Sequence, residues 1–542
     1  MTIDPELLDD LRDPRAYPHV PSTVEVVQTH ISCVFLAGDD VFKVKKPVRF
    51  SFLDFTTLER RRHFCDEEVR LNRRLAPEVY RGVVPIVRGA DGHRIGGRGE
   101  PVEYAVHMRR LPQARLLRAL VERGEADDAL MERIAVKMAA FHAHPDTEPA
   151  STESAAPEEI ARTLRETFTG LATNAGRADG PLPVGERAGD APPDGGVAAL
   201  DDLRLLTESA LARVAETLRR RCVAGRVRDG HGDLRPDHIC CTETLPIIDC
   251  VEFSLRLRTC DVASEIAFLA SELEFLDAQP LADALISAYV HASGDDDLRA
   301  VLPFFRAYRA EVRAMVAALT AAEPEVDAAQ CAQQRDDVRR YLALAARCAW
   351  RAQGPFLLVI MGRSGSGKST VAAALANATG LPVLRSDVLR KRLAGMAPLA
   401  RPATDDAAAR LYAPAHSAAV YAALVADAAP ALASGRGVIL DATFQRRDDR
   451  DRVRTLAAYA GVPLFWIVCR AEIDTMHARL RARAARDDEP SDATPAIADE
   501  QGRRFEPLTE GDEPRLSLTT DEDRDPAATA RRWLVHRLGV VS

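Results

Sequence analysis

The sequence has 542 residues, which is too long for a single hydrophobic core and predicts about three structural units. Its 46% hydrophobic and 28% charged residues are ordinary for a globular protein, and the net charge of −9 disfavours a general nucleic-acid-coating function. No apolar run approaches the roughly 18 residues of a membrane span, and the N-terminus lacks the basic and apolar segments of a secretory signal. None of the ten cysteines forms a C-x-x-C pair, which favours reduced thiols. We therefore expect a cytoplasmic protein without a membrane contact.

The first 111 residues carry short strand patterns and one helical stretch. The expected strands are 24–27, 32–36, 41–45, 82–87 and 102–108. Gly38, Asp39 and Asp40 supply a turn signal before the third strand, and residues 57–75 have a helical pattern. Several strands with one inserted helix predict a small α+β lobe over residues 1–111.

Residues 112–348 are mainly helical in pattern, so a second, larger lobe is expected to follow the first. Residues 173–196 depart from this pattern, because they are rich in Gly, Pro, Ala and Asp and have no apolar period. We interpret them as a flexible surface insertion without a part in the chemistry.

From residue 355 to the C-terminus, strand patterns alternate with helical ones. After the apolar run 356–361, strands are expected near 382–386, 437–442, 464–469 and 515–519. This alternation predicts an α/β domain over residues 355–542, with a five-stranded parallel sheet and helices on both faces.

The motif G-x-x-x-x-G-K-[ST] lies between the first strand of that domain and a run of helix formers. A loop of this pattern turns backbone N–H groups toward a polyphosphate at a helix N-terminus. We expect Lys368 to reach the β- and γ-phosphates and the Ser369 hydroxyl to hold Mg²⁺. The expected nucleotide-binding residues are Gly362, Arg363, Ser364, Gly365, Ser366, Gly367, Lys368, Ser369 and Thr370.

Three further side chains follow strands of the same domain. Asp387 comes just after the second strand, at the sheet edge that carries the phosphate loop. There it would accept the proton of a substrate hydroxyl, while Arg390 fixes an anionic group. Asp441 ends the run 438–441 and is a candidate metal carboxylate. The alternative interpretations are a helix N-cap for Asp387 and a strand-end turn residue for Asp441.

A basic helical stretch over residues 479–486 is a candidate lid. Its arginines, among them Arg483 and Arg486, would neutralise the transferring phosphoryl group when the lid closes. The alternative is a solvated helix face without a role in catalysis.

With these features, residues 355–542 resemble the small P-loop kinases that phosphorylate hydroxyl groups, such as gluconate kinases, adenylylsulfate kinases and 5′-hydroxyl polynucleotide kinases. The resemblance rests on the phosphate loop, on the pair Asp387 and Arg390, and on residues 438–441. It implies a kinase with a hydroxyl acceptor.

Residues 231–238 read His-Gly-Asp-Leu-Arg-Pro-Asp-His and resemble the catalytic loop of aminoglycoside phosphotransferases, H-G-D-x-x-x-x-N. The resemblance covers about residues 20–345 and implies a bilobal, protein-kinase-like domain. In such a domain Asp233 would orient and deprotonate the acceptor hydroxyl, and Asp249 matches the metal-binding aspartate.

Residues 41–45 look like the strand that carries the ATP-phosphate lysine. Lys43 and Lys45 share one face of this strand, so both are candidates, and Lys43 is preferred because apolar residues flank it. Glu67, on the following helix, is the expected partner of that lysine.

His238 departs from the family pattern, which has an asparagine metal ligand at this position. Mg²⁺ prefers oxygen ligands, so an imidazole is a poor replacement. Three interpretations stay open: the site uses fewer protein ligands, its catalysis is weakened, or the domain only binds. Asp261 and Glu265 are expected to support the loop from the start of a helix.

The order of the two halves resembles a group of bacterial two-domain proteins, in which an aminoglycoside-phosphotransferase-like domain precedes a P-loop kinase. We expect a two-site phosphotransferase that uses ATP or GTP with Mg²⁺ and transfers the γ-phosphoryl group to hydroxyls of small molecules. Two alternatives stay open. The C-terminal domain would phosphorylate 5′-hydroxyl ends of nucleic acid, which the net charge slightly disfavours, or a degenerate N-terminal sensor would regulate the C-terminal kinase.

Overall fold

The structure, a computed structural model, divides the chain into two compact units. It describes residues 3–50, 53–89, 92–149, 151–175, 195–322, 326–402, 404–484, 490–509 and 514–540. The first unit comprises residues 1–167 and 214–316, and the second comprises residues 168–213 and 317–542. These limits fall within helices α5 (Pro157–Ala175), α6 (Gly195–Val223) and α10 (Leu298–Ala321). The division into 1–111, 112–348 and 355–542 stays a prediction, and most of the insertion expected at 173–196 lies outside the described residues.

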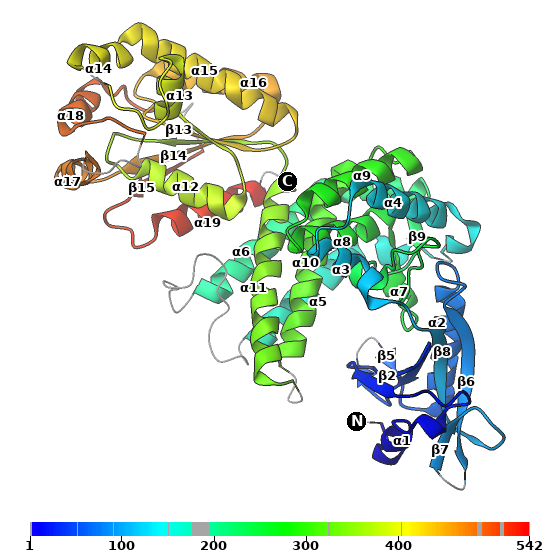
Figure 1. The fold of residues 1–542 in the computed structure, drawn as a ribbon. Helices are drawn as coiled ribbons and strands as arrows, with labels where there is room; N and C mark the ends of the chain where they lie inside the picture. Colours follow the sequence, from blue (N-terminus) through cyan, green and yellow to red (C-terminus); the bar gives the residue numbers. More distant parts are fainter. Residues whose placement is uncertain are drawn as a thin grey trace. The chain divides into compact units, whose positions relative to one another are not determined.

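The N-terminal lobe of the first unit is a six-stranded antiparallel sheet in the order β1-β2-β3-β8-β6-β7 (Figure 1). Its strands are β1 (Val24–Gln28), β2 (Ser32–Ala37), β3 (Asp40–Lys45), β6 (Tyr80–Gly89), β7 (Gly92–Ile95) and β8 (Pro101–Arg109). A small hairpin, β4 (Arg49–Phe50) and β5 (Leu53–Asp54), follows β3. The strands and helix predicted for this lobe are confirmed.

The sheet alternates its side chains between two cores, as a pleated strand requires. Helix α1 (Pro5–Asp10) packs on the face that carries Phe42 and Val44. Helix α2 (Leu58–Asn72) packs through Cys65 and Val69 on the opposite face, which carries Val41. Odd-numbered residues of β3 therefore point toward α2, and this places Lys43 and Lys45 beside that helix.

The C-terminal lobe of the first unit is built around helix α8 (Val262–Phe275), of which nearly every residue is buried. A helix whose residues are nearly all buried lies inside a core, and α8 packs against α9 (Gln279–Ser293). The lobe also contains α3 (Leu117–Glu122), α4 (Asp128–Ala143), α7 (Leu255–Arg258) and the antiparallel pair of β9 (Val227–Asp229) and β10 (Thr259–Asp261). The segment between β9 and α7 carries the His-Gly-Asp motif.

The second unit contains a five-stranded parallel sheet in the order β12-β13-β11-β14-β15. Its strands are β11 (Leu357–Met361), β12 (Val383–Arg385), β13 (Val438–Ala442), β14 (Leu464–Arg470) and β15 (Arg515–Thr519). Strands β11 and β13 are fully buried along their length, because helices cover both faces of the sheet. The predicted five-stranded parallel sheet is confirmed.

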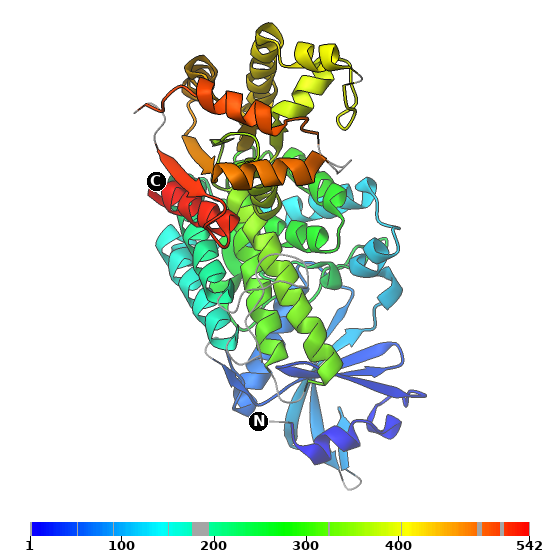
Figure 2. The same cartoon turned by 90° about the vertical axis from the view of Figure 1, so that its left-hand side faces the viewer.

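Helices α12 (Lys368–Thr379) and α19 (Pro526–Val540) cover one face of this sheet, while α13 (Ser386–Leu393), α15 (Pro414–Ala433) and α16 (Arg447–Ala460) cover the other (Figure 1). Figure 2 shows α17 (Ile473–Ala484) and α18 (Pro495–Arg504), in orange, lying side by side. The unit also includes α11 (Ala328–Arg351) and α14 (Asp405–Leu411).

Helix α15 is long and apolar enough to cross a membrane by length and composition alone. Its side chains Val420, Tyr421, Leu424 and Ala428 belong to the core of the second unit, where they pack on the sheet. One face of α15 therefore packs on the sheet, and 28% of its apolar window is buried.

Candidate functional sites

Two lysines of β3 lie in a buried network of carboxylates in the first unit. Lys43 Nζ is 2.6 Å from Asp249 Oδ1 and 2.9 Å from Glu68 Oε1. Lys45 Nζ is 2.6 Å from Glu68 Oε2 and also donates to Glu252 Oε1. Glu68 therefore bridges both lysines, and each lysine also binds one carboxylate from the segment 249–252.

The charges of this network stabilise one another. Burial alone lowers the pKa of Lys43, but the neighbouring carboxylates of Asp249 and Glu68 raise it well above its ordinary value. Burial alone raises the pKa of Asp249, yet the charge of Lys43 and its hydrogen bond hold it well below its ordinary range. Lysine and aspartate are thus both charged at neutral pH.

The helix partner of the lysines is Glu68, so the prediction of Glu67 was wrong. Glu67 instead accepts two hydrogen bonds from Arg70, one turn along α2, at 2.9 and 2.7 Å. One residue along a helix rotates the side chain by about 100°, which turns position 68 toward β3 and position 67 away from it.

The His-Gly-Asp loop places Asp233 beside a guanidinium. Arg235 Nε is 3.0 Å from Asp233 Oδ1, and Arg235 Nη2 is 3.0 Å from His238 Nε2. His238 Nε2 also lies 3.6 Å from Asp249 Oδ2. Burial alone raises the pKa of Asp233, but the charge of Arg235 holds it below its ordinary value. Asp233 is therefore ionised, lies close to Asp249 and can accept a proton.

Buried partners fix the backbone of this loop. Glu265 accepts a hydrogen bond from the Gly232 amide at 2.5 Å, and its other oxygen is 2.8 Å from His142 Nε2. Asp261 caps the start of α8 by accepting from the Ala263 amide at 2.8 Å. Glu265 therefore supports the loop from the start of α8, whereas Asp261 binds Arg221 and the loop-supporting role expected for it stays a prediction.

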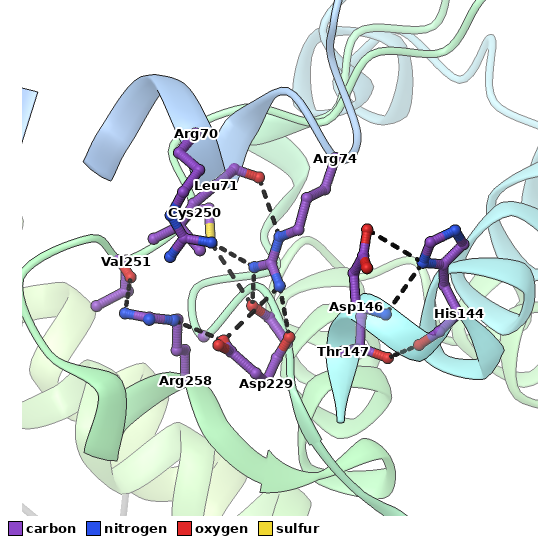
Figure 3. Close-up of polar contacts among 12 residues, drawn as sticks. Arg70, Leu71, Arg74, His144, Asp146, Thr147, Asp229, Cys250, Val251 and Arg258 are labelled. Carbon is purple, nitrogen blue, oxygen red and sulfur yellow. Dashed lines mark hydrogen bonds and ion pairs between the residues drawn. The ribbon is translucent and has the colours of Figure 1, made fainter. Parts of the chain in front are cut away.

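Arg74, at the end of α2, ties this helix to the start of the same loop (Figure 3). Its guanidinium donates to the carbonyl oxygens of Asp229 and Gly230, both at 2.8 Å. Arg258 donates to the Asp229 carboxylate at 2.5 Å and so holds the strand β9 from its other side. The helix that carries Glu68 and the loop that carries Asp233 are therefore joined directly.

In the second unit, the phosphate loop joins β11 to α12 as predicted. Gly365 and Gly367 have φ of 85° and 83°, and a Cβ at either would lie 2.8 Å from Met476 O or Thr520 Oγ1 respectively. Only glycine fits a left-handed conformation this close to its neighbours. Lys368 begins α12 and is 6% exposed. The loop thus has the backbone that the motif requires.

Asp441 lies at the same sheet edge, next to the start of α12. It is 3% exposed, and its Oδ1 has no hydrogen-bond partner among the described residues. Burial raises the pKa of Asp441, while the charge of Lys368 and a hydrogen bond with Ser369 oppose that rise. A carboxylate with an unsatisfied oxygen beside a hydroxyl is an oxygen donor set that suits Mg²⁺. Ser369 and Asp441 therefore fit the predicted metal roles.

Asp387 lies in the first turn of α13, where it is half-buried and acts electrostatically on both Asp441 and Tyr412. Arg390 is 9% exposed, stacks on the Tyr412 ring at 4.8 Å and donates to the Leu411 carbonyl oxygen at 2.8 Å. Part of the Arg390 guanidinium therefore holds the segment after α14. Its predicted contact with a substrate anion stays a prediction.

The arginines of α17 have different surroundings. Arg479 Nη1 donates to Thr520 Oγ1 at 2.8 Å and to the Gly365 carbonyl oxygen at 3.3 Å, so it supports the phosphate loop. Arg483 Nη2 is buried without a hydrogen-bond partner in the described part of the chain. Arg486 lies outside the described residues. The lid therefore stays a prediction for Arg483 and Arg486.

Several residues with a place in these sites were not predicted. Glu252 contacts Lys45, Thr520 accepts from Arg479, and Lys391 lies 3.1 Å from Asp492 Oδ2 while only 1% exposed. Thr520 follows the last strand of a parallel sheet, and this position alone could have indicated it. Glu252 and Asp492 have no such signal, because their contacts join distant parts of the sequence.

The fold and the two sites define a class: a protein whose first unit joins a six-stranded antiparallel sheet to a mainly helical lobe and whose second unit is a P-loop domain with a five-stranded parallel sheet. Residues 357–508 match the AAA domain family. The chain is 32% identical over 482 residues to the uncharacterized protein Rv2004c of Mycobacterium tuberculosis H37Rv, covering 88% of this chain and 89% of that protein. It belongs to the family of that mycobacterial protein.

Two solved structures are similar to parts of the chain. A choline/ethanolamine kinase family protein from Mesorhizobium loti is 14% identical, covers 63% of this chain and 99% of its own, and has a TM-score of 0.35. A gluconokinase from Sinorhizobium meliloti is 22% identical, covers 34% of this chain and 94% of its own, and has a TM-score of 0.24.

Proposed function

We propose that the protein is a cytoplasmic phosphotransferase with two nucleotide sites, each transferring the γ-phosphoryl group of ATP or GTP to a hydroxyl of a small molecule. The observation that carries the proposal is the orphaned, buried oxygen of Asp441 beside Ser369 and Lys368 at the start of α12. A nucleotide-bound cation would satisfy that oxygen.

In the P-loop site, Ser369 and Asp441 would hold Mg²⁺, which neutralises charge on the phosphate oxygens. Lys368 and the N-terminal amides of α12 bind the phosphates at the positive end of the helix. Asp387 orients the acceptor hydroxyl and takes its proton. Arg483, which acts electrostatically on Tyr412 and whose buried Nη2 has no hydrogen-bond partner among the described residues, favours an acceptor that carries an anionic group.

In the kinase-like site, Asp249 would hold Mg²⁺ and Lys43 binds the nucleotide phosphates. Asp233 has an ionised carboxylate at neutral pH, as a group that orients a hydroxyl and accepts its proton must have. Lys45 is fully buried between two carboxylates, so its role is to hold Glu68 and Glu252 rather than to touch nucleotide.

The test is nucleotide turnover by the wild-type, Lys368→Ala and Asp233→Ala proteins against a panel of hydroxylated metabolites, with a 5′-hydroxyl oligonucleotide included. We expect Lys368→Ala to abolish transfer to one acceptor and Asp233→Ala to abolish transfer to another. Turnover undiminished in both variants would refute the proposal. Transfer to the oligonucleotide alone would favour the nucleic-acid kinase, and loss in Lys368→Ala alone would favour the N-terminal sensor.

A further inference from the structure

Arg235 lies inside the catalytic loop of the kinase-like site and contacts three of its side chains. Its Nε is 3.0 Å from Asp233 Oδ1, its Nη2 is 3.0 Å from His238 Nε2, and its Nη1 is 3.8 Å from Asp237 Oδ2. The guanidinium thus lies between Asp233, which is expected to bind the acceptor hydroxyl, and His238, which stands where aminoglycoside phosphotransferases have an asparagine.

The hydrogen bonds of His238 fix which ring nitrogen has a lone pair. Its Nδ1 is 2.9 Å from the Asp233 carbonyl oxygen, which can only accept, so Nδ1 carries the proton. Nε2 lies 3.0 Å from Arg235 Nη2, and because a guanidinium can only donate, Nε2 accepts this hydrogen bond with its lone pair. The one atom of His238 that would coordinate a metal is already bonded to Arg235.

Neighbouring side chains hold Arg235 in this position. Asp237 is itself fixed by Arg118, whose Nε and Nη2 donate to its two oxygens at 2.6 and 3.1 Å. The side chains of Arg235 and His238 are 19% and 8% exposed. A divalent cation at His238 would lie against a guanidinium and would have to displace it, so the donor set does not fit a metal ion there.

Asp249 has a different surrounding: Lys43 binds its Oδ1 at 2.6 Å, whereas its Oδ2 lies 3.6 Å from the imidazole and its side chain is 43% exposed. One carboxylate together with nucleotide phosphates is a usual Mg²⁺ environment. A single ion therefore fits at Asp249, whereas a second ion at His238 does not.

We propose that the kinase-like site takes its nucleoside triphosphate with one divalent cation, and that Arg235 supplies a fixed positive charge at the position where a second ion would bind. The inference rests on the proposed nucleotide binding by this domain. It makes Arg235 a phosphate-binding residue, because guanidinium donors match phosphate oxygens. It also makes His238 a positioning residue for Arg235 rather than a metal ligand.

The test counts ions in the full-length protein. Lys368→Ala/Ser369→Ala removes the P-loop site, and the protein is titrated with Mn²⁺ and a non-hydrolysable ATP analogue while electron paramagnetic resonance measures free Mn²⁺. We expect one Mn²⁺ per bound nucleotide. Adding Arg235→Ala/His238→Asn restores a family-type oxygen ligand and should raise the count to two. The matched control, Arg123→Ala/His144→Asn at exposed positions of the same unit, should leave it at one.

A count of two before Arg235 is altered would overturn the proposal. A second measurement does not need the Arg235→Ala/His238→Asn variant to fold. Pulsed electron paramagnetic resonance on the bound Mn²⁺ detects nitrogen ligands, and we expect the same spectrum with His238 and with His238→Gln, because His238 does not bind the ion. A nitrogen coupling that disappears in His238→Gln would identify His238 as a ligand and would equally overturn the proposal. Equilibrium dialysis of the labelled ATP analogue shows whether the kinase-like domain binds nucleotide at all. No bound nucleotide in the P-loop-deficient protein would reject the proposed function of this domain, and the inference with it.

Discussion

Lys43 and Lys45 are two residues apart on one strand face, yet their environments differ. The side chain of Lys43 is 13% exposed and its partner Asp249 is 43% exposed, whereas Lys45 and Glu68 are fully buried. A lysine that binds nucleotide must reach the solvent-facing part of the cleft. The distribution of exposure therefore supports Lys43 as the phosphate-binding lysine and gives Lys45 a structural role.

We expect Lys45→Met to destabilise the protein by about 3–5 kcal/mol, because it leaves Glu68 and Glu252 as buried carboxylates without this cation. Urea denaturation at neutral pH measures the effect. Lys43→Met is the control and should cost less, since Asp249 is already partly hydrated. Equal stability of Lys45→Met and wild type would contradict the structural role.

Glu67 and Glu68 form a natural pair of test and control. Glu68→Gln weakens two buried ion pairs and should cost about 1–3 kcal/mol and lower nucleotide affinity at the kinase-like site. Glu67→Gln disturbs a surface pair with Arg70 and should change stability by less than about 1 kcal/mol. Thermal unfolding and nucleotide titration measure both. A larger loss of stability in Glu67→Gln than in Glu68→Gln would show that Glu67, rather than Glu68, is the partner of the lysines.

Among the elements, α8 carries the carboxylate that supports the catalytic loop. Burial alone raises the pKa of Glu265, but hydrogen bonds and charge from His142, together with His231 and the Gly232 amide, lower it to about 2. A carboxyl group with a lowered pKa stabilises the fold above its ordinary pKa of about 4.3. That stabilisation is lost as the pH falls toward 2.

The difference in unfolding free energy between wild type and Glu265→Gln should therefore shrink by about 1–2 kcal/mol between pH 6 and pH 3. Urea denaturation at a series of pH values checks this prediction. Glu153→Gln, on the surface of the same unit, is a suitable control whose difference from wild type should stay constant. A difference for Glu265→Gln that grows on acidification would contradict the sign of the shift.

The phosphate loop permits a similarly direct test. Gly365→Ala places a Cβ 2.8 Å from the Met476 carbonyl oxygen in a left-handed conformation, at a strain of about 1–3 kcal/mol. Because the loop must relax to relieve it, nucleotide affinity at this site should fall about tenfold to a hundredfold. Gly395→Ala is the control, since it has a similar φ and no atom within 4 Å of the added Cβ. Isothermal titration distinguishes the two.

The elements that sequence predicts well are those with a local pattern. Buried parallel strands are continuous apolar runs, so β11, β13 and β14 could be located directly. The partner on α2 was missed by one residue, since the charged positions 66–68 do not show which of them faces the sheet. Which face of α2 points toward the sheet depends on how Cys65 and Val69 pack, and this packing is a tertiary contact.

For the whole molecule, the two proposed nucleotide sites predict a binding stoichiometry. Equilibrium dialysis with a non-hydrolysable ATP analogue should give two nucleotides per wild-type chain and one for Lys368→Ala. It should also give one for Lys43→Ala, and none when both lysines are replaced. A single nucleotide on the wild-type chain would leave only one of the two domains as a nucleotide-binding domain.

Motif spacing predicts the main residues of both sites, but it does not predict the partners that distant parts of the sequence supply. Asp233, Asp249, Lys368 and Asp441 follow from local patterns; of these, Lys368 begins α12 and Asp441 lies near the end of β13, at the predicted end of the parallel sheet. Lys45 and Glu252 are 207 residues apart, and Lys391 and Asp492 are 101 apart. No sequence period links such positions, so contacts of this kind require the three-dimensional structure.

The pairing of Lys45 with Glu252 also has a consequence for how the chain folds during synthesis. Strand β3 and helix α2 leave the ribosome some 180 residues before Glu252 does. Until Glu252 emerges, the buried ammonium group of Lys45 has one of its two carboxylate partners, Glu68. Contacts of such high sequence separation form late. The nascent N-terminal lobe should therefore stay protease-sensitive until the segment after Asp249 emerges, and it then gains its protection in one cooperative step.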